Sequence, residues 1–398
     1  MKMKAPAEPR TDRSLTFLLH FVFLLSGIAT VLIGQVLPHL TSRFALDDLQ
    51  AGYFFPAQFA GSLTGTLLTN WLGRSGRLIP ASAAGGILMA VGILMMDLAS
   101  YQAVLVGFLI NGLGIGLTLP AINVLILERD PARSASNLAF LNFFWGVGAI
   151  ISKPYVDLTA TGSSLGLTTV LLAAPLLISS VALFFAPAKA EARVQKASER
   201  TSELSPIWTN PMAWAIAAFN FIHVGFESGM GGWLTTYTGR VETTQAIQFS
   251  SPTFLFFLFF VSGRGISPLF FRYLDENKVL MTSLLVIFGG LVITLLAADL
   301  FVLGLGASIC GVGTSAIFPT NVSRFSKTFG PDAMRRATPL FICGTLGATV
   351  VTWLIGFLSN YSGSLRSGMA VLAVSIILLI LLQIGLSAYG RRSEQRVK

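Results

Sequence analysis

Three polar residues lie on one face of an otherwise apolar stretch in the second half of the chain. Asn220, His223 and Glu227 are spaced i, i+3 and i+7, which places them on one side of a helix. In a helix that begins near Met212, His223 lies about 17 Å along the axis, close to the middle of a membrane-crossing segment. A carboxylate and an imidazole four residues apart can share a proton, so we predict that His223 and Glu227 form a proton-coupling pair facing a cavity. The alternative is a structural bond that holds this helix to its neighbours.

A second polar stripe occurs in the first half of the chain. Asn142, Trp145, Ala149 and Lys153 recur at i, i+3, i+7 and i+11 and also share one helix face. An indole beside an amide suits a sugar, because the ring packs on apolar C–H faces and the amide bonds hydroxyl groups. A packing role is the alternative for both side chains. Lys153 lies toward the end of its stretch, where its ammonium group can reach the headgroups, pair with Glu227 or attract an anionic solute.

Other polar groups inside apolar stretches are candidates for a solute cavity, because polar groups that face lipid remain unsatisfied. Arg264 falls in the inner half of its stretch, and we interpret it as a packing or gate contact in preference to a direct solute ligand. The predicted solute-binding residues are Gln35, Gln58, Asn123, Asn142, Trp145, Asn220 and Asn321.

The sequence carries no signal for catalysis. It contains no HExxH or GxSxG motif, no phosphate-binding loop and no cluster of intramembrane acids suited to a metal. The two cysteines, Cys310 and Cys343, both fall in apolar stretches and predict neither a disulfide nor a metal site. We therefore predict that the protein is not an enzyme, has no catalytic residues and binds neither a metal nor a cofactor.

Membrane helices must position these side chains. Hydrophobic residues make up 53% of the 398 residues, charged residues make up 11%, and the mean hydropathy is +0.72. Such a composition excludes an ordinary soluble protein. Each crossing of the bilayer takes about 20 helical residues. The twelve predicted spans are residues 14–40, 50–72, 78–98, 102–127, 134–158, 166–187, 212–238, 249–272, 279–298, 301–323, 337–359 and 366–389.

The basic residues indicate how these helices are oriented. Of the 27 Lys and Arg residues, 22 lie in the tails and in the even-numbered connections, whereas Arg43, Arg240 and Arg366 lie in the odd-numbered ones. Loops that face the cytoplasm carry such an excess. We therefore predict cytoplasmic termini and a multi-pass protein of a bacterial inner membrane, with basic loops beside anionic lipids. The net charge of +9 is dispersed, so we predict no nucleic-acid partner, and we expect a monomer.

The chain divides into two halves. A charged cytoplasmic linker, residues 188–210, separates an N-terminal bundle of six helices (1–187) from a C-terminal bundle of six helices (211–398). The pair Gly148-Ala149 in the fifth span matches Gly347-Ala348 in the eleventh, and each pair follows a similar approach, DPAR and DAMR. Repeated halves are typical of secondary transporters, whose solute lies near the membrane midplane between the repeats.

Small residues and prolines predict how the helices pack and bend. Gly61 and Gly65 in the second span have the four-residue spacing that lets two helices approach closely, and so do Gly112 and Gly116 in the fourth span. Pro120 and Pro319 are expected to kink the fourth and tenth helices. These features suit two rocking bundles, although ordinary membrane packing uses the same residues.

The layout of six spans, a cytoplasmic loop and six more spans resembles the major facilitator superfamily. The loop after the second span, GRSGR at residues 73–77, resembles the motif that this superfamily carries there. Arg74, Gly76 and Arg77 match, whereas Gly73 replaces an Asp and Leu78 replaces a basic residue. The resemblance implies two pseudo-symmetric six-helix bundles and a charge or gating role for Arg74 and Arg77. Lys153 and Arg264 are predicted to have such roles because they are charged residues inside apolar stretches.

Four further segments are similar to the fucose, galactose and glucose permeases within that superfamily. They are GIGLTLPAIN (114–123), VGFESGMGGW (224–233), Gly263-Arg264 and GVGTSAIFP (311–319). The chain departs from that pattern near Leu119, where those permeases carry an acid, and in the first helix, where Gln35 is the nearest polar candidate. Coupling through those two acids is therefore not carried over.

These features together predict a secondary active transporter of a small hydrophilic solute. A neutral sugar moved by alternating access with H⁺ is the leading expectation. The alternatives are an exporter of amphipathic drugs or lipids, or an organic-anion carrier, in the same fold. The fifth helix reads GVGAIISKPY (146–155) and lacks the Gly-Pro pattern typical of proton-coupled drug antiporters.

Overall fold

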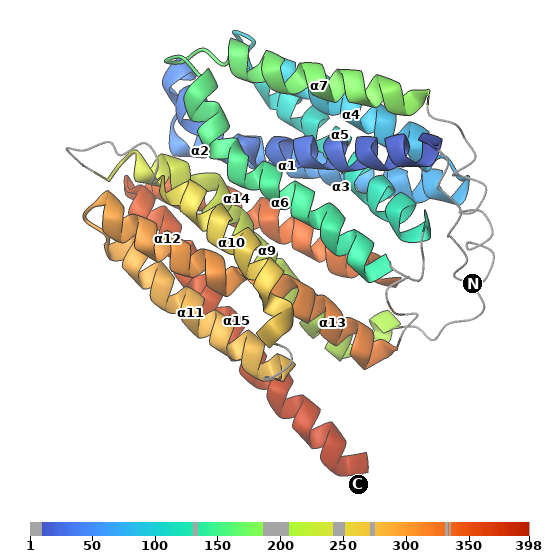
Figure 1. The fold of residues 1–398 in the computed structure, drawn as a ribbon. Helices are drawn as coiled ribbons and strands as arrows, with labels where there is room; N and C mark the ends of the chain where they lie inside the picture. Colours follow the sequence, from blue (N-terminus) through green and yellow to red (C-terminus); the bar gives the residue numbers. More distant parts are fainter. Residues whose placement is uncertain are drawn as a thin grey trace, which may run out of the picture. The chain divides into compact units, whose positions relative to one another are not determined.

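The computed structural model of this protein describes residues 10–129, 134–185, 207–241, 251–270, 275–330, 333 and 336–397, and nearly all of them are helical (Figure 1). A 3-10 turn, η3 (Ile207–Thr209), precedes α9. The α-helices are α1 (Arg10–Phe44), α2 (Asp48–Gly52), α3 (Phe54–Arg74), α4 (Leu78–Met95), α5 (Tyr101–Arg129), α6 (Ser134–Thr159), α7 (Gly166–Phe184), α9 (Pro211–Thr238), α10 (Pro252–Phe270), α11 (Glu276–Leu296), α12 (Leu300–Ser315), α13 (Ile317–Phe329), α14 (Thr338–Ser362) and α15 (Leu365–Val397).

Each of the twelve predicted spans corresponds to helix in the described chain. Among the described residues, eight stretches are long and apolar enough to cross a membrane by length and composition alone, and Pro252–Ile266 in α10 is a shorter apolar stretch. The spans carried by α3, α6 and α9 are not among these eight. The predicted all-helical membrane fold is confirmed, while the side on which the termini lie stays a prediction.

The tenth span is a broken helix. The structure divides it at Ala316 into α12 and α13, and α13 extends to Phe329, six residues beyond the predicted end of the span. Pro319 lies three residues after the break and has no backbone N–H to continue the helical bonding. The helix predicted to bend at Pro319 is thus interrupted at Ala316. Pro120 lies inside α5, which is assigned as one helix from Tyr101 to Arg129, so the kink expected there stays a prediction.

Short polar side chains begin several helices. Asp47 accepts a hydrogen bond from the backbone N–H of Gln50, and the Gln50 side chain accepts one from the backbone N–H of Asp47. This capping box satisfies amides that the first turn of α2 would leave unpaired. Asn210 caps α9 through the N–H of Met212, and Asp275 caps α11 through the N–H of Lys278. The backbone bond from Lys278 holds the pKa of the Asp275 carboxyl below its usual range.

The helices form two compact units. Unit 1 comprises residues 1–30, 60–148 and 166–202, and unit 2 comprises residues 31–59, 149–165 and 203–398. Unit 2 therefore combines the second half of the chain with the end of α1, all of α2, the start of α3 and the end of α6. The predicted boundary, residues 188–210, lies outside the described residues up to residue 206, so the predicted division into bundles and linker stays a prediction.

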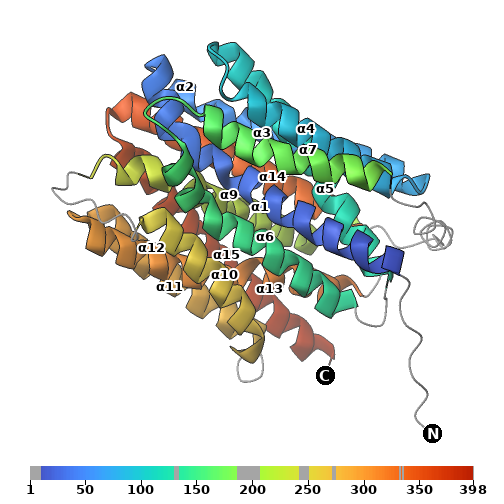
Figure 2. The same cartoon turned by 45° about the horizontal axis from the view of Figure 1, so that its top comes forward.

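In unit 1, close helix contacts depend on glycine. A Cβ on Gly61 would lie 2.0 Å from the carbonyl oxygen of Leu109, and one on Gly116 would lie 2.1 Å from that of Ser62. Helices α3 and α5 therefore approach each other backbone to backbone, as the glycine spacing predicts. Helix α4 packs against both α5 and α7, and α4 and α7 run side by side in two views (Figure 1 and Figure 2).

In unit 2, α9 and α14 make the closest helix pair. A Cβ on Gly347 of α14 would lie 1.8 Å from the carbonyl oxygen of Phe221 in α9. Trp233 of α9 is fully buried and donates its indole N–H to the carbonyl oxygen of Thr352. Helices α10, α11 and α12 pack beside one another in the same unit. This packing fixes the rotation of α9 about its axis, and so the direction in which its polar residues point.

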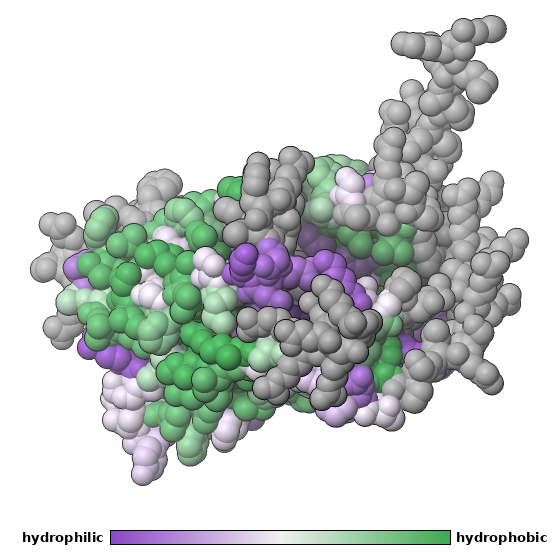
Figure 3. All heavy atoms as spheres, turned by 90° about the horizontal axis from the view of Figure 1, so that it is seen from below, coloured by the Kyte–Doolittle hydropathy of each residue, from purple (hydrophilic) through white to green (hydrophobic). Residues whose placement is uncertain are grey.

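Large apolar side chains cover much of the described surface. Phe17, Trp71, Phe301 and Tyr361 are each more than half exposed, and apolar residues dominate the described part of the face drawn in Figure 3. In a membrane protein such residues can face the lipid tails without a free-energy penalty, because the tails are as apolar as the side chains themselves. The exposed apolar surface therefore fits a multi-pass membrane protein.

Candidate functional site

The carboxylate of Glu227 is the centre of a charged cluster near the middle of α9. An Nη atom of Arg264 in α10 lies 3.6 Å from Glu227 Oε1, and Nε2 of His223 lies 3.6 Å from Oε2. At this length both are electrostatic contacts and not hydrogen bonds. The side chains of Glu227 and Arg264 are 21% and 29% exposed, whereas that of His223 is 1% exposed. The side chains of Glu227 and Arg264 are therefore partly accessible to a probe the size of water, whereas an ion pair with only a structural role can be fully buried.

The surroundings of Arg264 are aromatic. Its guanidinium carbon lies 4.1 Å from the centre of the Phe260 ring, one helical turn earlier in α10. A guanidinium over an aromatic face gains a cation–π attraction. The contact also holds the charged head of Arg264 beside Glu227. Arg264 is thus the ion-pair partner of Glu227, a pairing that the sequence spacing did not indicate.

The imidazole of His223 is buried. Neither of its ring nitrogens has a hydrogen-bond partner among the described residues, and its Nε2 lies 3.6 Å from the Glu227 carboxylate. A buried imidazole with no bond to hold one tautomer can accept or release a proton at either nitrogen. The structure thus brings the predicted pair His223 and Glu227 together, and their proton-coupling role stays a prediction.

Asn220 and Asn321 hold helices together. Asn220 Nδ2 donates to the carbonyl oxygen of Leu340 in α14 at 3.0 Å, and Asn321 Nδ2 donates to that of Ile216 in α9 at 3.2 Å. The amide oxygen of each asparagine is buried and has no partner among the described residues. The amide N–H of each asparagine thus joins two helices, while its amide oxygen has no partner among the described residues. The solute-binding role of both residues stays a prediction.

Gln35 and Lys153 line a cavity of about 660 Å³ in unit 2, together with Thr235, Arg240 and His39. Gln35 Oε1 accepts a hydrogen bond of 2.8 Å from Thr235, whose hydroxyl also bonds that of Thr253. Lys153 pairs with Asp157, four residues on, so the structure gives it a carboxylate partner other than Glu227. Glu227, His223 and Arg264 are not among the residues that line this cavity.

The remaining candidates are dispersed. Asn142 is exposed and donates to the carbonyl oxygen of Leu138 in its own helix, and Asn123 does the same toward Leu119. Trp145 is half-buried against the core of unit 1, and its indole N–H has no partner among the described residues. Gln58 is buried in α3. Asn123, Asn142 and Trp145 lie in unit 1 and Gln58 lies in unit 2, and the solute-binding role of all four stays a prediction.

Arg74 and Arg77 flank the tight turn between α3 and α4. Both are exposed, and Gly76 between them has φ of +70°, a backbone conformation that residues with a Cβ rarely adopt. The glycine of the RSGR sequence is thus explained by the turn. The gating role of the two arginines stays a prediction.

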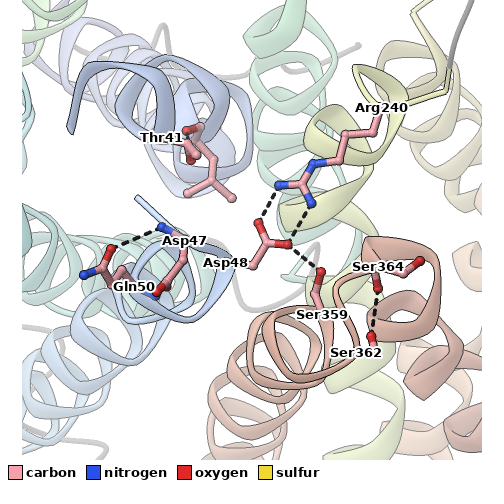
Figure 4. A network of polar contacts seen from close by, with 9 residues as sticks. Thr41, Asp47, Asp48, Gln50, Arg240, Ser359, Ser362 and Ser364 are labelled. Atoms are coloured by element: carbon pink, nitrogen blue, oxygen red, sulfur yellow. Dashed lines mark hydrogen bonds and ion pairs between the residues drawn. The ribbon is translucent and has the colours of Figure 1, made fainter. Parts of the chain in front are cut away.

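One polar network was not anticipated from the sequence. Asp48 of α2 binds both Arg240, which follows α9, and Ser359 of α14 (Figure 4). The available signal was the position of Arg240, one of only three basic residues in the odd-numbered connections. No spacing rule links it to an aspartate 192 residues earlier.

Comparison with curated proteins gives two similar transporters. The 4-hydroxybenzoate transporter PcaK of Pseudomonas aeruginosa is 27% identical over 260 residues, covering 59% of this chain and 57% of that protein. PcaK of Pseudomonas putida is 29% identical over 259 residues, covering 57% of this chain and 55% of that protein. The chain thus spans little more than half the length of the curated relatives it matches.

Solved structures show the same fold at low identity. A single-residue variant of the fucose:proton symporter FucP of E. coli has a TM-score of 0.62 at 18% identity and covers 95% of this chain and 99% of its own. A D-xylose–proton symporter has a TM-score of 0.73 at 14% identity and covers 94% and 97%. A single-residue variant of the nucleoside transporter NupG has a TM-score of 0.76 at 14% identity and covers 94% and 99%.

A family model supplies the assignment. The model described as Major Facilitator Superfamily matches residues 19–342, most of the chain, in agreement with the fold and with the resemblance of the loop at residues 73–77. The chain belongs to the major facilitator superfamily and is a multi-pass membrane transporter.

Proposed function

We propose that this transporter moves a small organic acid together with a proton by alternating access, and that Glu227 is its proton site. The observation that carries the proposal is the contact of Glu227 with Arg264 on one side and His223 on the other. An acid deep in a membrane helix is costly and is by default a functional candidate. Its partial exposure gives a proton a route to the carboxylate.

Charge balance supports the coupling. Ionised Glu227 neutralises part of the charge of Arg264, since the two lie 3.6 Å apart. Protonation of Glu227 removes that negative charge, and an anionic solute beside Arg264 replaces it. Proton and organic anion therefore favour each other's binding, which is the reciprocal coupling that cotransport requires. His223, whose Nε2 lies 3.6 Å from the Glu227 carboxylate, is placed to pass the proton to Glu227.

The kind of acid is suggested by the curated relatives. Phe260 is fully buried beneath the Arg264 guanidinium and leaves no open face for a solute, so it does not bear on this choice. The curated relatives carry the name of 4-hydroxybenzoate transporters, an aromatic acid, over the part of the chain that they match. We therefore favour small aromatic carboxylates as the first solutes to assay.

A neutral sugar is the second candidate. The observation that favours it is Trp145, whose indole N–H has no partner among the described residues and whose ring is partly exposed. An indole packs against the C–H face of a sugar while its N–H bonds a hydroxyl. A sugar carries no charge, however. If the solute is a sugar, the guanidinium of Arg264 beside Glu227 has no part in recognising it.

The test of coupling uses the purified protein in liposomes with an imposed pH gradient. We expect Glu227→Gln to abolish accumulation of solute against its gradient while solute exchange at equal pH continues, because a glutamine cannot carry the proton. The matched control is Glu276→Gln, which removes a carboxylate paired with Lys327 at 2.7 Å and leaves the Glu227 cluster intact. Accumulation that survives Glu227→Gln contradicts the proposal.

The test of substrate class is thermal unfolding with aromatic acids, sugars and amphipathic compounds. A ligand at 100 times its dissociation constant stabilises its bound state by about 2.7 kcal/mol, which raises the unfolding temperature measurably. We expect stabilisation by aromatic acids. Stabilisation by sugars alone favours the second candidate, and stabilisation by amphipathic compounds alone contradicts both.

A further inference from the structure

The cavity of about 660 Å³ in unit 2 lies at the ends of helices, apart from the Glu227 cluster. Its lining includes Gln35 near the end of α1, Lys153 near the end of α6 and Thr235 near the end of α9. Thr235 follows Glu227 by eight residues, which is about 12 Å along the helix axis. We call this space the helix-end cavity. Its volume is in the range of small-ligand sites.

The ammonium group of Lys153 has donors to spare in this cavity. The Lys153 side chain is 14% exposed, and that of its partner Asp157 is 42% exposed. An ammonium group has three N–H donors, and among the described residues only the Asp157 carboxylate accepts one of them. Two donors of a cation that is largely shielded from bulk water are therefore left for a ligand.

Arg240 brings a second cation to the lining. Its guanidinium uses two of its five N–H donors on Asp48, and its side chain is 42% exposed. Asp157 is the one carboxylate among the described residues that line the cavity. The charged groups of the lining thus have more unused donors than acceptors, which suits a ligand group rich in acceptors, such as a carboxylate.

A buried hydroxyl in the lining also lacks a partner. Thr236 is 6% exposed, and its hydroxyl oxygen has no hydrogen-bond partner among the described residues. The hydroxyl of Thr238, which lines the cavity as well, donates instead to the carbonyl oxygen of Leu234 at 2.7 Å. A buried hydroxyl without a hydrogen bond is unfavourable, so a ligand that accepts from Thr236 gains affinity.

We propose that the helix-end cavity is a second solute site, which binds the carboxylate of a small organic acid through the ammonium of Lys153 and the hydroxyl of Thr236. The apolar side chains of Pro38, Pro252 and Leu300 line the same cavity and can receive the rest of the acid. Only the choice of an organic acid rests on the proposed function, because no residue of the Glu227 cluster lines this cavity.

The test measures how a ligand protects a thiol in the purified full-length protein. Cys310→Ser and Cys343→Ser remove both native thiols, and Ser42→Cys places one thiol at an exposed position of the lining. Labelling by a maleimide is followed at increasing concentrations of 4-hydroxybenzoate, or of 4-hydroxybenzamide as its uncharged match. We expect the acid to slow labelling and the amide to have no effect. Equal protection by the two compounds, or protection by neither, would overturn the proposal.

A second reporter shows whether protection is local. Ser362→Cys, in the same background, places the thiol at an exposed position between α14 and α15 that does not line the cavity. The acid should leave its labelling rate unchanged. Equal protection at positions 42 and 362 would contradict binding in the helix-end cavity.

Two variants that break the same ion pair distinguish recognition from a structural role. Lys153→Gln removes the proposed ligand donor, so the half-protecting concentration of the acid should rise at least about tenfold, the effect of losing a charged hydrogen bond. Asp157→Asn removes a carboxylate that competes for the ammonium and repels an anion, so this concentration should fall. If both variants raise it to the same extent, the pair is only structural and the proposal is wrong.

A matched pair of threonines tests the hydroxyl. Thr236→Val should raise the half-protecting concentration about threefold, the effect of losing one neutral hydrogen bond. Thr238→Val should leave it unchanged, because that hydroxyl is already bonded to Leu234. The same value in both variants would show that Thr236 takes no part, contrary to the site as proposed.

The outcomes are distinct from those of the transport assay. Adding Arg264→Gln should leave protection at position 42 unchanged, since Arg264 does not line the cavity, and loss of protection in that variant would contradict a separate second site. Labelling requires neither transport nor a pH gradient. Accumulation that survives Glu227→Gln therefore overturns the coupling proposal and leaves the protection result as it was.

Discussion

The role of Arg264 follows from the two side chains that it contacts, Glu227 and Phe260. Its guanidinium rests on Phe260 and faces Glu227, so it is neither a lipid-facing charge nor a simple packing contact. An arginine in this position presents a planar fork that matches a carboxylate, which a lysine does not. The proposed recognition of an organic acid therefore depends on the shape of the side chain as well as on its charge.

Replacing Arg264 should separate the two solute classes. We expect Arg264→Gln to weaken binding of an aromatic acid by at least about tenfold, the effect of losing a charged hydrogen bond, and Arg264→Lys to weaken it less. Binding of a neutral sugar should change by less than about twofold, because sugar hydroxyls do not require the charge. Calorimetric titration of the purified variants measures both, and an unchanged dissociation constant for the acid rules out direct recognition by Arg264.

Helices α9 and α14 show how the elements place the site. Their backbones meet at Gly347 and Phe221, and Asn220 adds a side-chain bond to the carbonyl oxygen of Leu340 close by. The close approach fixes the rotation of α9, so Glu227, on the stripe that begins at Asn220, is directed at α10. A small residue in α14 thus controls the direction of a charged residue in α9.

A side chain at Gly347 should therefore destabilise the protein. A Cβ there would lie 1.8 Å from the Phe221 carbonyl oxygen, so Gly347→Ala must push the two helices apart. We expect a loss of about 1–3 kcal/mol of stability, typical of overpacking, and a lower unfolding temperature in detergent. Gly385→Ala in α15 is the control, since a Cβ there meets nothing within 4 Å. If both variants unfold at the same temperature, the close contact of α9 with α14 does not matter for stability.

At the scale of the whole molecule, the two compact units do not coincide with the two halves of the sequence. The sequence divides at the predicted linker into two sets of six spans, yet unit 2 also takes residues 31–59 and 149–165 from the first set. The contacts of Asp48 with Arg240 and Ser359, and the bond between Gln35 and Thr235, lie within that unit. The second half of the chain is therefore held to parts of the first half by contacts other than the linker.

Cutting the chain in the predicted linker tests this. Fragments 1–198 and 199–398, expressed together with a tag on the second alone, should purify as a complex of about one to one, because the contacts within unit 2 remain. Adding Asp48→Asn to the first fragment should reduce the amount recovered. Recovery of the tagged fragment alone would show that the linker is what holds the halves together.

The sequence by itself determined what depends on neighbouring residues. The twelve spans, the shared face of Asn220, His223 and Glu227, and the break near Pro319 follow from apolar runs, helical spacing and a missing N–H, all of which are local. The caps at Asp47 and Asp275 are local as well.

Only the tertiary structure decided which groups meet. It paired Glu227 with Arg264, and it joined Asp48 to Arg240 and Ser359. A helix that is apolar on every side shows from its sequence neither which face points inward nor which helix lies beside it. Those choices are made by close packing at residues such as Gly347, because the rotation of a membrane helix is set by the neighbour whose backbone it can approach.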